Sequence, residues 1–521
     1  MSAWDDLLNH RDSVCKTSLQ ELHDQENDRS EVYRLDFAGL CIDFSRNQVS
    51  RDTVGLLLKL ADETSLTEKI RSLFNGDEIN QSEQRPALHF ALRNSGAVSF
   101  NNNNQNISEQ IMQELDRVSD FVTDIQSGSI TGHSNKKITD IVNIGIGGSE
   151  LGPKLLHDAL KPYWQSDINI HFLANIDADE FFHLLKRLNP EQTLFVVSSK
   201  SFTTNETMLN ASRARQWLLD HDCRDISKHM VAVTANVRQA LNFGITEPNI
   251  FRIWDWVGGR YSVWSAISLA AMAKIGVQNF KDFLAGAHLM DQHFMSTPFR
   301  NNIPVMLGLL DVWSINFLGN NTLAIIPYSS SLAYLPAYLS QLFMESNGKN
   351  LDQQQRSLSI DSGAVIWGGV GTNVQHAFMQ LLHQGTRSLP VEFLVGTRNH
   401  FADSNYQRHL YANCIAQGEA LMRGSQTTEP GAFNHVSGNK PSTTIIYDLL
   451  TPATLGMLLA MYEHRVFVQA SIWDINPFDQ WGVELGKKLS EKILTESGDQ
   501  DKVNLDSTTQ SLLQYFNSRQ N

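Results

Sequence analysis

Hydroxyl side chains and a lysine are concentrated in the segment SKSFTTNET, residues 199–207. The polar groups in question belong to Ser199, Lys200, Ser201, Thr203 and Thr204. The segment follows the strand-like run TLFVVS and opens a predicted helix, where hydroxyls and free N–H groups can bind the oxygens of a phosphate group. An ordinary capping box, such as Thr203 with Glu206, is the alternative. Because an N-cap needs only one hydroxyl, the excess favours phosphate binding.

A glutamate lies near the predicted end of a helix in QLFMESNGK, residues 341–349. Asn347 or Gly348 can adopt the left-handed conformation that ends the helix, which leaves Glu345 in the last turn. A carboxylate at the negative end of a helix dipole is disfavoured by about 0.3–1 kcal/mol, so it takes up a proton more readily. Gln341 lies one turn earlier on the same face. We therefore treat Glu345 as a candidate general base.

The stretch WDINPFDQWGVELGKK near the C-terminal end predicts another polar helix face. Asp479 is the expected N-cap, and Gln480 is expected to open the helix. Gln480 and Lys487 are seven residues apart, about two turns, so they share a face. An amide beside an ammonium suits a polyhydroxylated anionic ligand. The alternative is a surface helix with an ion pair between Glu484 and Lys488.

A glycine-rich loop, IGIGGSELGP at residues 144–153, joins a predicted strand to a predicted helix. It is not a dinucleotide-binding loop, because Glu150 occupies the place of the third glycine and would repel a pyrophosphate. A Walker-type phosphate loop is absent from the sequence as well. A tight turn and a sugar-contacting loop both remain open for this segment.

Two further motifs carry a possible catalytic side chain. Arg260 follows two glycines in WDWVGGRYS and precedes an apolar helix predicted at Val263–Ala273. It could be structural, or its fixed charge could stabilise an enediolate. In GTNVQHAFMQLLHQG, His376 is expected near a helix start, with His383 two turns later. A helix start disfavours the charged imidazolium and suits proton transfer, whereas no third ligand supports metal binding.

Composition restricts the class of protein. The 521 residues carry a net charge of −14 with no basic run, which argues against nucleic acid and anionic membranes as partners. The cysteines have no paired spacing, which argues against disulfides or a zinc site and fits a reducing cytoplasm. They are Cys15, Cys41, Cys223 and Cys414. The start MSAWDDLLNH does not resemble a signal peptide, and Ile303–Leu318 reads as a buried helix rather than a bilayer span.

Strand-like runs alternate with helical segments after a mostly helical first 110 residues, which include a possible hairpin around Leu40–Phe44. The first series of runs is Ile141–Ile146, Ile168–Leu173, Leu194–Val197, Val231–Val233 and Ile250–Ile253. The second series is Leu323–Ile326, Ala364–Trp367, Val391–Val395, Thr444–Tyr447 and Val466–Ile472. Such alternation predicts parallel sheets with helices on both faces, hence two α/β units in tandem.

Together these motifs resemble the ordered motif set of the glucose-6-phosphate isomerase family, from about Ile79 through Lys488. The resemblance implies an α/β fold of two tandem SIS-type doubly wound parallel-sheet domains. The expected parts are a helical segment at 1–110, SIS-type domains at 111–287 and 288–492, and a helical tail at 493–521. It also implies a homodimer that interconverts D-glucose 6-phosphate and D-fructose 6-phosphate, in glycolysis and gluconeogenesis, without a metal or organic cofactor.

The resemblance also implies a role for individual residues. Glu345 would carry a proton between C2 and C1 through a cis-enediolate that Arg260 stabilises. His376, from the other subunit, and Lys487 would assist ring opening. The phosphate would be held by Ser199, Lys200, Ser201 and Thr204. The sugar would be contacted by Gly148, Ser149, Gln341 and Gln480.

Several positions depart from the family pattern. Ser201 replaces a usual threonine, and Val374 stands where glycine is usual, two residues before His376. Ser340 and Phe343 lie in a stretch that is usually more polar or small. Preference for another phosphosugar stays open, and a non-catalytic phosphosugar-binding protein is the main alternative of a different class. The presence of all four acid–base and charge-stabilising groups disfavours that alternative.

Overall fold

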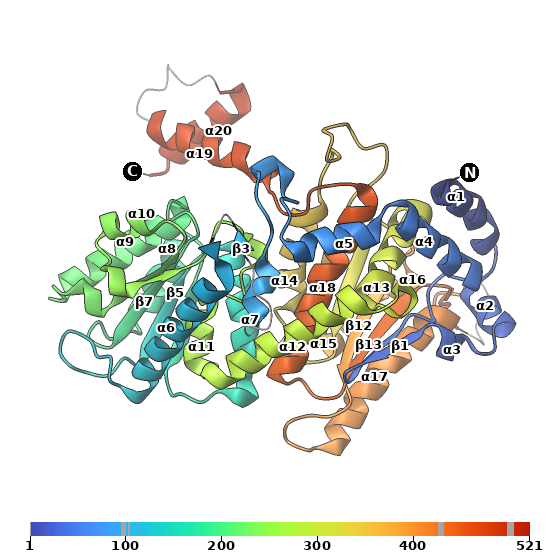
Figure 1. Cartoon of the computed structure of the whole chain (residues 1–521), viewed down its shortest axis with the longest axis horizontal. Coiled ribbons are helices and arrows are strands. Elements are labelled where there is room, and N and C mark those ends of the chain that lie inside the picture. The colour runs from blue at the N-terminus through green and yellow to red at the C-terminus, as the bar shows by residue number, and fades with distance from the viewer. Residues whose placement is uncertain (1, 95–100, 103–104, 426–431, 497–504, 521) are drawn as a thin grey trace. The chain divides into compact units, whose positions relative to one another are not determined.

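The computed structural model describes residues 2–94, 101–102, 105–425, 432–496 and 505–520. These divide into two compact units, Met1–Phe478 and Asp479–Asn521, each described by itself. The first unit contains two extended sheets, and the second consists of helices (Figure 1).

The first sheet is entirely parallel, with strand order β6-β5-β7-β8-β9. Its strands are β5 (Asp140–Ile144), β6 (Asn169–Leu173), β7 (Thr193–Ser198), β8 (Met230–Thr234) and β9 (Ile250–Arg252). The neighbouring helices are α6 (Ile107–Ser127), α7 (Leu151–Ala159), α8 (Ala178–Leu185), α9 (Asn205–Asp220), α10 (Val237–Phe243) and α11 (Leu269–Ile275). These strands confirm the five runs of the first predicted series.

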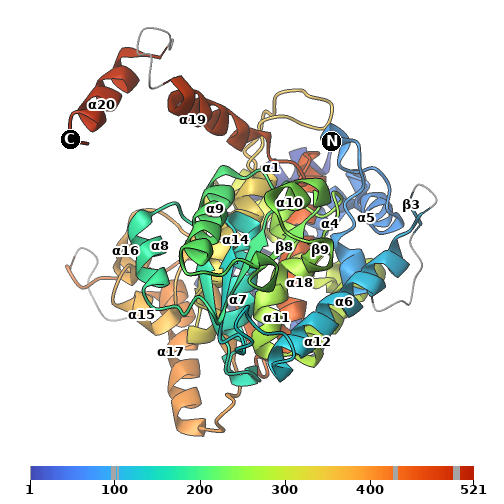
Figure 2. The ribbon, with the colours of Figure 1, turned by 90° about the vertical axis from the view of Figure 1, so that its left-hand side faces the viewer.

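The alternation of side-chain direction along each strand explains why helices cover both faces of the sheet. In β7, Leu194 and Val196 belong to one core, whereas Phe195 and Val197 belong to another. The first core includes apolar residues of α6 and α11, and the second includes residues of α8, α9 and α10 (Figure 2). Because successive side chains of a strand point to opposite faces, a strand that is buried throughout needs a helical layer on each side.

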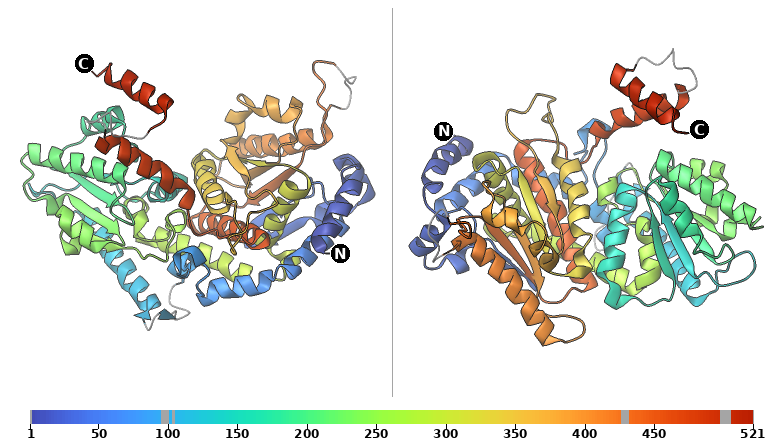
Figure 3. Two further views of the ribbon diagram at one scale, coloured as in Figure 1. Left: turned by 90° about the horizontal axis from the view of Figure 1, so that it is seen from above. Right: turned by 180° about the vertical axis from the view of Figure 1, so that it is seen from behind.

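The second sheet mixes parallel and antiparallel strands in the order β1-β2-β13-β12-β10-β11. Its strands are β1 (Arg34–Phe37), β2 (Leu40–Asp43), β10 (Thr322–Pro327), β11 (Val365–Gly368), β12 (Val391–Gly396) and β13 (Ser442–Tyr447). The hairpin β1–β2 pairs antiparallel with β13, so a segment near the N-terminus completes the sheet. Figure 3 shows the blue N-terminal helices beside the orange strands of this sheet.

The last predicted strand, Val466–Ile472, is wrong, because it lies inside α18 (Pro452–Trp473). Nearly every residue of α18 is buried, against α12 (Val277–Ser296), α13 (Ile303–Val312) and α14 (Leu335–Asn347). A helix surrounded by protein is apolar on all sides, and so a short apolar run taken from it has the pattern of a buried strand. The predicted buried helix at Ile303–Leu318 is confirmed, as α13 followed by a π-helical turn at Trp313–Phe317.

The remaining helices of the first unit lie at its N-terminus and around the second sheet. They are α1 (Ala3–Val14), α2 (Leu19–Gln25), α3 (Arg29–Val32), α4 (Arg51–Glu63), α5 (Leu66–Asn75), α15 (Gly371–Gln375), α16 (Met379–Gln384) and α17 (Ser404–Arg423). β3 (Asn101–Asn102) and β4 (Gln105–Asn106) pair antiparallel as a two-stranded ribbon. The second unit contains α19 (Glu484–Glu496) and α20 (Ser507–Asn517). No helix within the described ranges has the length and apolar character needed to span a bilayer.

Candidate active site

The loops after β5 and β7 meet at one edge of the first sheet, because the carboxyl ends of parallel strands lie together there. A buried hydrogen bond links the two strand ends, from Ser198 Oγ to Asn143 Oδ1 at 2.9 Å. The Asn143 amide in turn donates to the carbonyl oxygen of Ser149 at 2.9 Å. The predicted sugar-contacting loop and the predicted phosphate loop are therefore fixed to each other.

The glycines after β5 permit two close approaches. At Gly148, a Cβ atom would lie 2.0 Å from the carbonyl oxygen of Gly259, so only glycine allows the backbones to touch. Gly147 has a φ of +62°, and a Cβ atom there would lie 3.1 Å from Gln341 Nε2. This loop is thus packed between the turn that carries Arg260 and the helix α14.

Arg260 is buried, and its guanidinium donates hydrogen bonds to more than one partner. Its Nε donates to Ser346 Oγ at 2.6 Å, and its Nη2 donates to the carbonyl oxygen of Pro477. Tyr261 bonds to the same Ser346 oxygen at 2.9 Å. The guanidinium cannot leave this position without breaking buried hydrogen bonds. The helix expected directly after it, at Val263–Ala273, begins only at Leu269, after 3₁₀ turns.

Glu345 lies in the last turn of α14, as predicted, and faces Arg260. Its Oε2 accepts a hydrogen bond from Gln341 Nε2 at 2.8 Å, and its Oε1 lies 3.4 Å from Arg260 Nη1. The side chain is 23% exposed, so a small molecule can reach the carboxylate. A partly exposed carboxylate beside a fixed guanidinium can exchange a proton with a ligand while the cation stabilises a developing oxyanion.

The end of α14 differs from the prediction. Gly348 has φ −75° rather than a left-handed conformation. Instead, Lys349 Nζ donates to the carbonyl oxygens of Glu345 at 3.2 Å and Ser346 at 2.8 Å. A lysine that binds the last carbonyls offsets the negative end of the helix dipole. The geometry of Glu345 therefore depends on a cation that we did not single out in the sequence.

The predicted phosphate loop precedes α9, with Thr204 at the N-cap position. The alternative capping box of Thr203 with Glu206 is not the one in place, because the N-cap is Thr204, whose side chain makes no capping bond. The Oγ1 of Thr207 is buried without a partner. Instead, the hydroxyls of the loop contact one another, Ser199 Oγ with Thr204 Oγ1 at 3.2 Å and Thr203 Oγ1 with Ser201 Oγ at 2.8 Å. The first turn of α9 thus keeps backbone N–H groups available for an anion.

Lys200 ties the phosphate loop to the segment before Arg260. Its ammonium donates to the carbonyl oxygens of Asp255 at 2.7 Å and Val257 at 2.9 Å. Burial of the ammonium, with a smaller contribution from the nearby positive charge of Arg85, lowers the pKa of Lys200 to about 8. Lys200 therefore both braces the loop and places a titratable cation beside it.

His376 does not open a helix as we predicted. It is the C-cap of the short helix α15 and is exposed, whereas His383 belongs to the separate helix α16 and contacts Gln417 Oε1 at 2.8 Å. The apolar periodicity of the motif continues across the break between the two helices, which is why the sequence suggested one helix.

Three departures from the family pattern lie in the packing around these elements. Val374 is 6% exposed and belongs to the core beneath the second sheet. Phe343 is buried and packs against Tyr462. Ser340 Oγ donates to the carbonyl oxygens of Pro336 and Ile366 at 2.8 and 2.9 Å. These contacts are structural ones.

Gln480 and Lys487 belong to the second unit. Gln480 precedes a 3₁₀ turn, Trp481–Val483, and α19 begins at Glu484, so the predicted shared helix face is wrong. Pro477 and Gly482 favour a non-helical start to this segment, which the seven-residue spacing of Gln480 and Lys487 does not reveal. Lys487 Nζ pairs with Glu484 Oε1 at 2.8 Å, in place of the alternative pair with Lys488.

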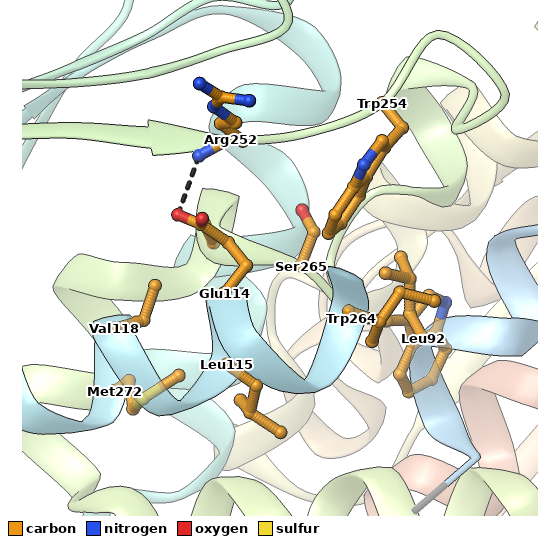
Figure 4. A pocket seen from close by; sticks show the side chains of 11 residues that line it. Leu92, Glu114, Leu115, Val118, Arg252, Trp254, Trp264, Ser265 and Met272 are labelled. Atoms are coloured by element: carbon orange, nitrogen blue, oxygen red, sulfur yellow. Dashed lines mark hydrogen bonds between the residues drawn. The ribbon is translucent and has the colours of Figure 1, made fainter. Parts of the chain in front are cut away.

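A hollow elsewhere in the first unit contains none of the predicted site residues. Leu92, Trp264 and Trp254 form much of its lining, and Glu114 accepts a hydrogen bond from the backbone N–H of Arg252 at 2.8 Å (Figure 4). Its lining is mostly apolar and lacks a second carboxylate or a histidine. Glu345 and Arg260, the candidate base and charge-stabilising group described above, do not line this hollow.

Comparisons with known proteins agree with the geometry. The family model described as phosphoglucose isomerase matches residues 43–513. A glucose-6-phosphate isomerase from Marinomonas sp. (strain MWYL1) is 44% identical, over 100% of this chain and 99% of the relative. Another from Shewanella frigidimarina is 45% identical, over 99% and 98%. The crystal structure of a glucose-6-phosphate isomerase from Chlamydia trachomatis has a TM-score of 0.88 and 32% identity, covering 99% of both chains.

Proposed function

This chain belongs to the phosphoglucose isomerase family, and we infer from that membership that it is an aldose–ketose isomerase. It catalyses the reversible conversion of D-glucose 6-phosphate and D-fructose 6-phosphate, a reaction of glycolysis and gluconeogenesis. The observation that best supports a mechanism is the Glu345 carboxylate, reachable from outside and 3.4 Å from the buried Arg260 guanidinium.

We assign the proton transfer to Glu345. The carboxylate removes the proton from C2 of the open-chain aldose and returns it to C1, so that the intermediate is a cis-enediolate. The hydrogen bond from Gln341 restricts the rotation of the carboxylate, which keeps one oxygen aimed at the substrate. The C2 proton is weakly acidic, so its removal requires that the oxyanion be stabilised at the same time.

Arg260 supplies that stabilisation in our proposal. Its bonds to Ser346 and Pro477 fix the guanidinium before the substrate arrives, so little reorganisation is needed as negative charge develops on the enediolate.

The loop of Ser199, Lys200, Ser201 and Thr204 holds the phosphate. The hydroxyls that bond one another without substrate can turn to donate to phosphate oxygens, together with the N–H groups at the start of α9. Binding the phosphate at a distance from C1 and C2 places the open chain in register with Glu345. Gly148, Ser149, Gln341 and Gln480 contact the sugar.

Ring opening precedes the proton transfer, and we assign it to His376 and Lys487. The two residues move protons at the ring oxygen and at the anomeric hydroxyl. His376 is exposed at the C-cap of α15, which is compatible with its reaching the site of a second subunit. The proposed active form is therefore a homodimer in which each site is completed by its neighbour. We propose that it acts in the cytoplasm, the compartment that the unpaired cysteine spacing favours.

The test is turnover of fructose 6-phosphate by the purified protein in buffer containing EDTA, with glucose 6-phosphate followed by a coupled dehydrogenase. We expect full activity, because all the assigned proton transfers use side chains. A wild-type protein that binds fructose 6-phosphate without converting it would support the non-catalytic sugar-binding alternative instead. Activity that disappears with EDTA and returns with a metal would contradict the side-chain mechanism.

A further inference from the structure

Two histidines and a cysteine that are distant in sequence come together in the first unit. His133 Nδ1 lies 3.0 Å from His229 Nε2, and His133 Nε2 lies 3.8 Å from Cys223 Sγ. One ligating atom from each of the three residues falls within 4.8 Å of the other two. Cys223 and His229 are completely buried, whereas His133 is partly exposed in the turn before β5. The cluster thus has a buried base and one side that solvent can reach.

The cluster lies at the opposite edge of the sheet from the candidate active site. His229 directly precedes β8, and its ring contacts the carbonyl oxygen of Thr193 at the start of β7. Ser199, at the active-site edge, follows the end of β7. Six residues of β7 at about 3.3 Å each separate the two edges. Nothing in the proposed reaction uses these three side chains.

The hydrogen bonds determine which nitrogen of His229 can bind a cation. His229 Nδ1 lies 2.8 Å from the Thr193 carbonyl oxygen, which can only accept, so Nδ1 carries the proton. The lone pair is then on Nε2, which accepts a hydrogen bond from the backbone N–H of His133 at 2.9 Å and lies 3.0 Å from His133 Nδ1. A cation bound to Nε2 would replace this hydrogen bond. An imidazole held through its other nitrogen by a carbonyl is the usual arrangement of a metal-ligating histidine.

We propose that His133, Cys223 and His229 form a Zn²⁺ site. Imidazole nitrogens and thiolates are the ligand types that Zn²⁺ usually takes in proteins, whereas Mg²⁺ and Ca²⁺ prefer oxygen ligands. Tetrahedral coordination requires the three ligating atoms to be about 3.3–3.8 Å apart. The turn that carries His133 is at the surface, so a small movement of this turn closes the set. The Cys223 thiol gives up its proton to the buffer as the Zn–S bond forms.

The fourth ligand is a water molecule or Glu191. The Glu191 carboxylate interacts electrostatically with both His133 and Cys223. It also forms an ion pair with Lys136, in the same turn as His133. A bound Zn²⁺ would therefore connect the turn between α6 and β5 to the starts of β7 and β8. Because the metal binds the folded chain and not the separated ligands, it would stabilise this edge of the sheet.

The test is Zn²⁺ binding to the full-length protein, measured by competition with a chromophoric chelator. We compare the wild type with Cys223→Ser and with the surface variant His133→Ala. Cys414→Ser is the matched control, because Cys414 is also a buried free cysteine but has no histidine partner among the described residues. We expect one equivalent of Zn²⁺ in the wild type and in Cys414→Ser, and at least about tenfold weaker binding in both site variants.

Co²⁺ gives an independent signature, because a Co²⁺–thiolate bond produces a charge-transfer band in the near ultraviolet. The band should appear in the wild type and be lost in Cys223→Ser while His133→Ala, which keeps the thiol, shows a weaker band. Zn²⁺ should also raise the melting temperature of the wild type more than that of either site variant.

Either of two results would overturn the proposal. One is Zn²⁺ binding in Cys223→Ser and His133→Ala that equals that of the wild type, which would place the metal elsewhere. The other is the absence of stoichiometric binding and of the Co²⁺–thiolate band in the wild type. Isomerase activity serves as the folding control, because none of the three residues has a role in the proposed reaction.

Discussion

Arg260 and the loop Ser199–Thr204 belong to the same candidate site but are held by the fold in different ways. Arg260 is buried and bonds to Ser346 and to the carbonyl oxygen of Pro477, residues that are distant in sequence. Ser201 and Thr203 are exposed and bond mainly to each other. The reacting groups are thus fixed before substrate arrives, whereas the exposed hydroxyls of the phosphate loop can rotate to bind it. The first region should therefore govern kcat and the second KM.

The largest effect should come from Glu345→Gln. The amide keeps the shape and can still accept the hydrogen bond from Gln341, but it cannot take up the C2 proton. We expect kcat to fall about 10³-fold while KM changes little. Steady-state kinetics with fructose 6-phosphate measure both values. The exposed Glu68→Gln serves as control. Turnover near the wild-type value in Glu345→Gln would remove Glu345 from the role of base.

Arg260→Lys tests whether the fixed geometry, rather than the charge alone, matters. An ammonium keeps the charge but cannot reproduce the separate bonds to Ser346, Pro477 and Glu345. We expect kcat to fall about 10²-fold, with a lower melting temperature because buried acceptors lose their partners. If Arg260→Lys changed KM and left kcat unchanged, this would contradict the proposal that Arg260 governs kcat and the phosphate loop governs KM.

The double variant Ser201→Ala with Thr204→Ala addresses the phosphate loop. The two substitutions remove loop hydroxyls that bind a charged ligand. They should raise KM for fructose 6-phosphate about tenfold and leave kcat nearly unchanged. Thr203→Ala in the same loop is the comparison, because no phosphate contact is assigned to it. An unchanged KM in the double variant would move the phosphate site away from this loop.

The smallest predicted effect is a change in KM with pH. The pKa of Lys200 is lowered to about 8, chiefly by burial, so the ammonium loses its charge as the pH rises through 8. Attraction for the phosphate dianion then decreases, and KM should rise about threefold between pH 7 and 9. In Lys200→Met this pH dependence should disappear. A wild-type KM that stays constant over this range would show that the Lys200 charge does not contribute to binding.

Much of the fold could be predicted because strand runs in parallel sheets are short, apolar and bounded by polar loops. The nine strands that form the predicted parallel runs all lie where the sequence suggested. Val466–Ile472 failed because periodicity cannot separate a buried strand from part of a buried helix such as α18. The family resemblance is also confirmed, because it depended on several motifs in order rather than on one pattern.

Within the candidate site, local motifs identified residues but not the contacts between distant ones. The bond from Arg260 to Pro477 spans 217 residues, and the sequence has no periodic signal for it. Local geometry was misjudged at His376 and Gln480, where a break between helices and a 3₁₀ turn interrupt the expected helices. Cysteine spacing did not suggest the cluster at Cys223, because one of its two histidines, His133, is 90 residues away in the sequence.

The most direct test of the central claim is transfer of solvent deuterium to the sugar by wild-type protein and by Glu345→Gln. Fructose 6-phosphate is incubated with each protein in D₂O, and deuterium at C1 and C2 is followed by NMR. We predict incorporation by the wild type, because the proton carried by Glu345 can exchange with solvent, and loss of both incorporation and turnover in Glu345→Gln, which still binds the substrate. Incorporation by Glu345→Gln at the wild-type rate would contradict the assignment of Glu345 as the base.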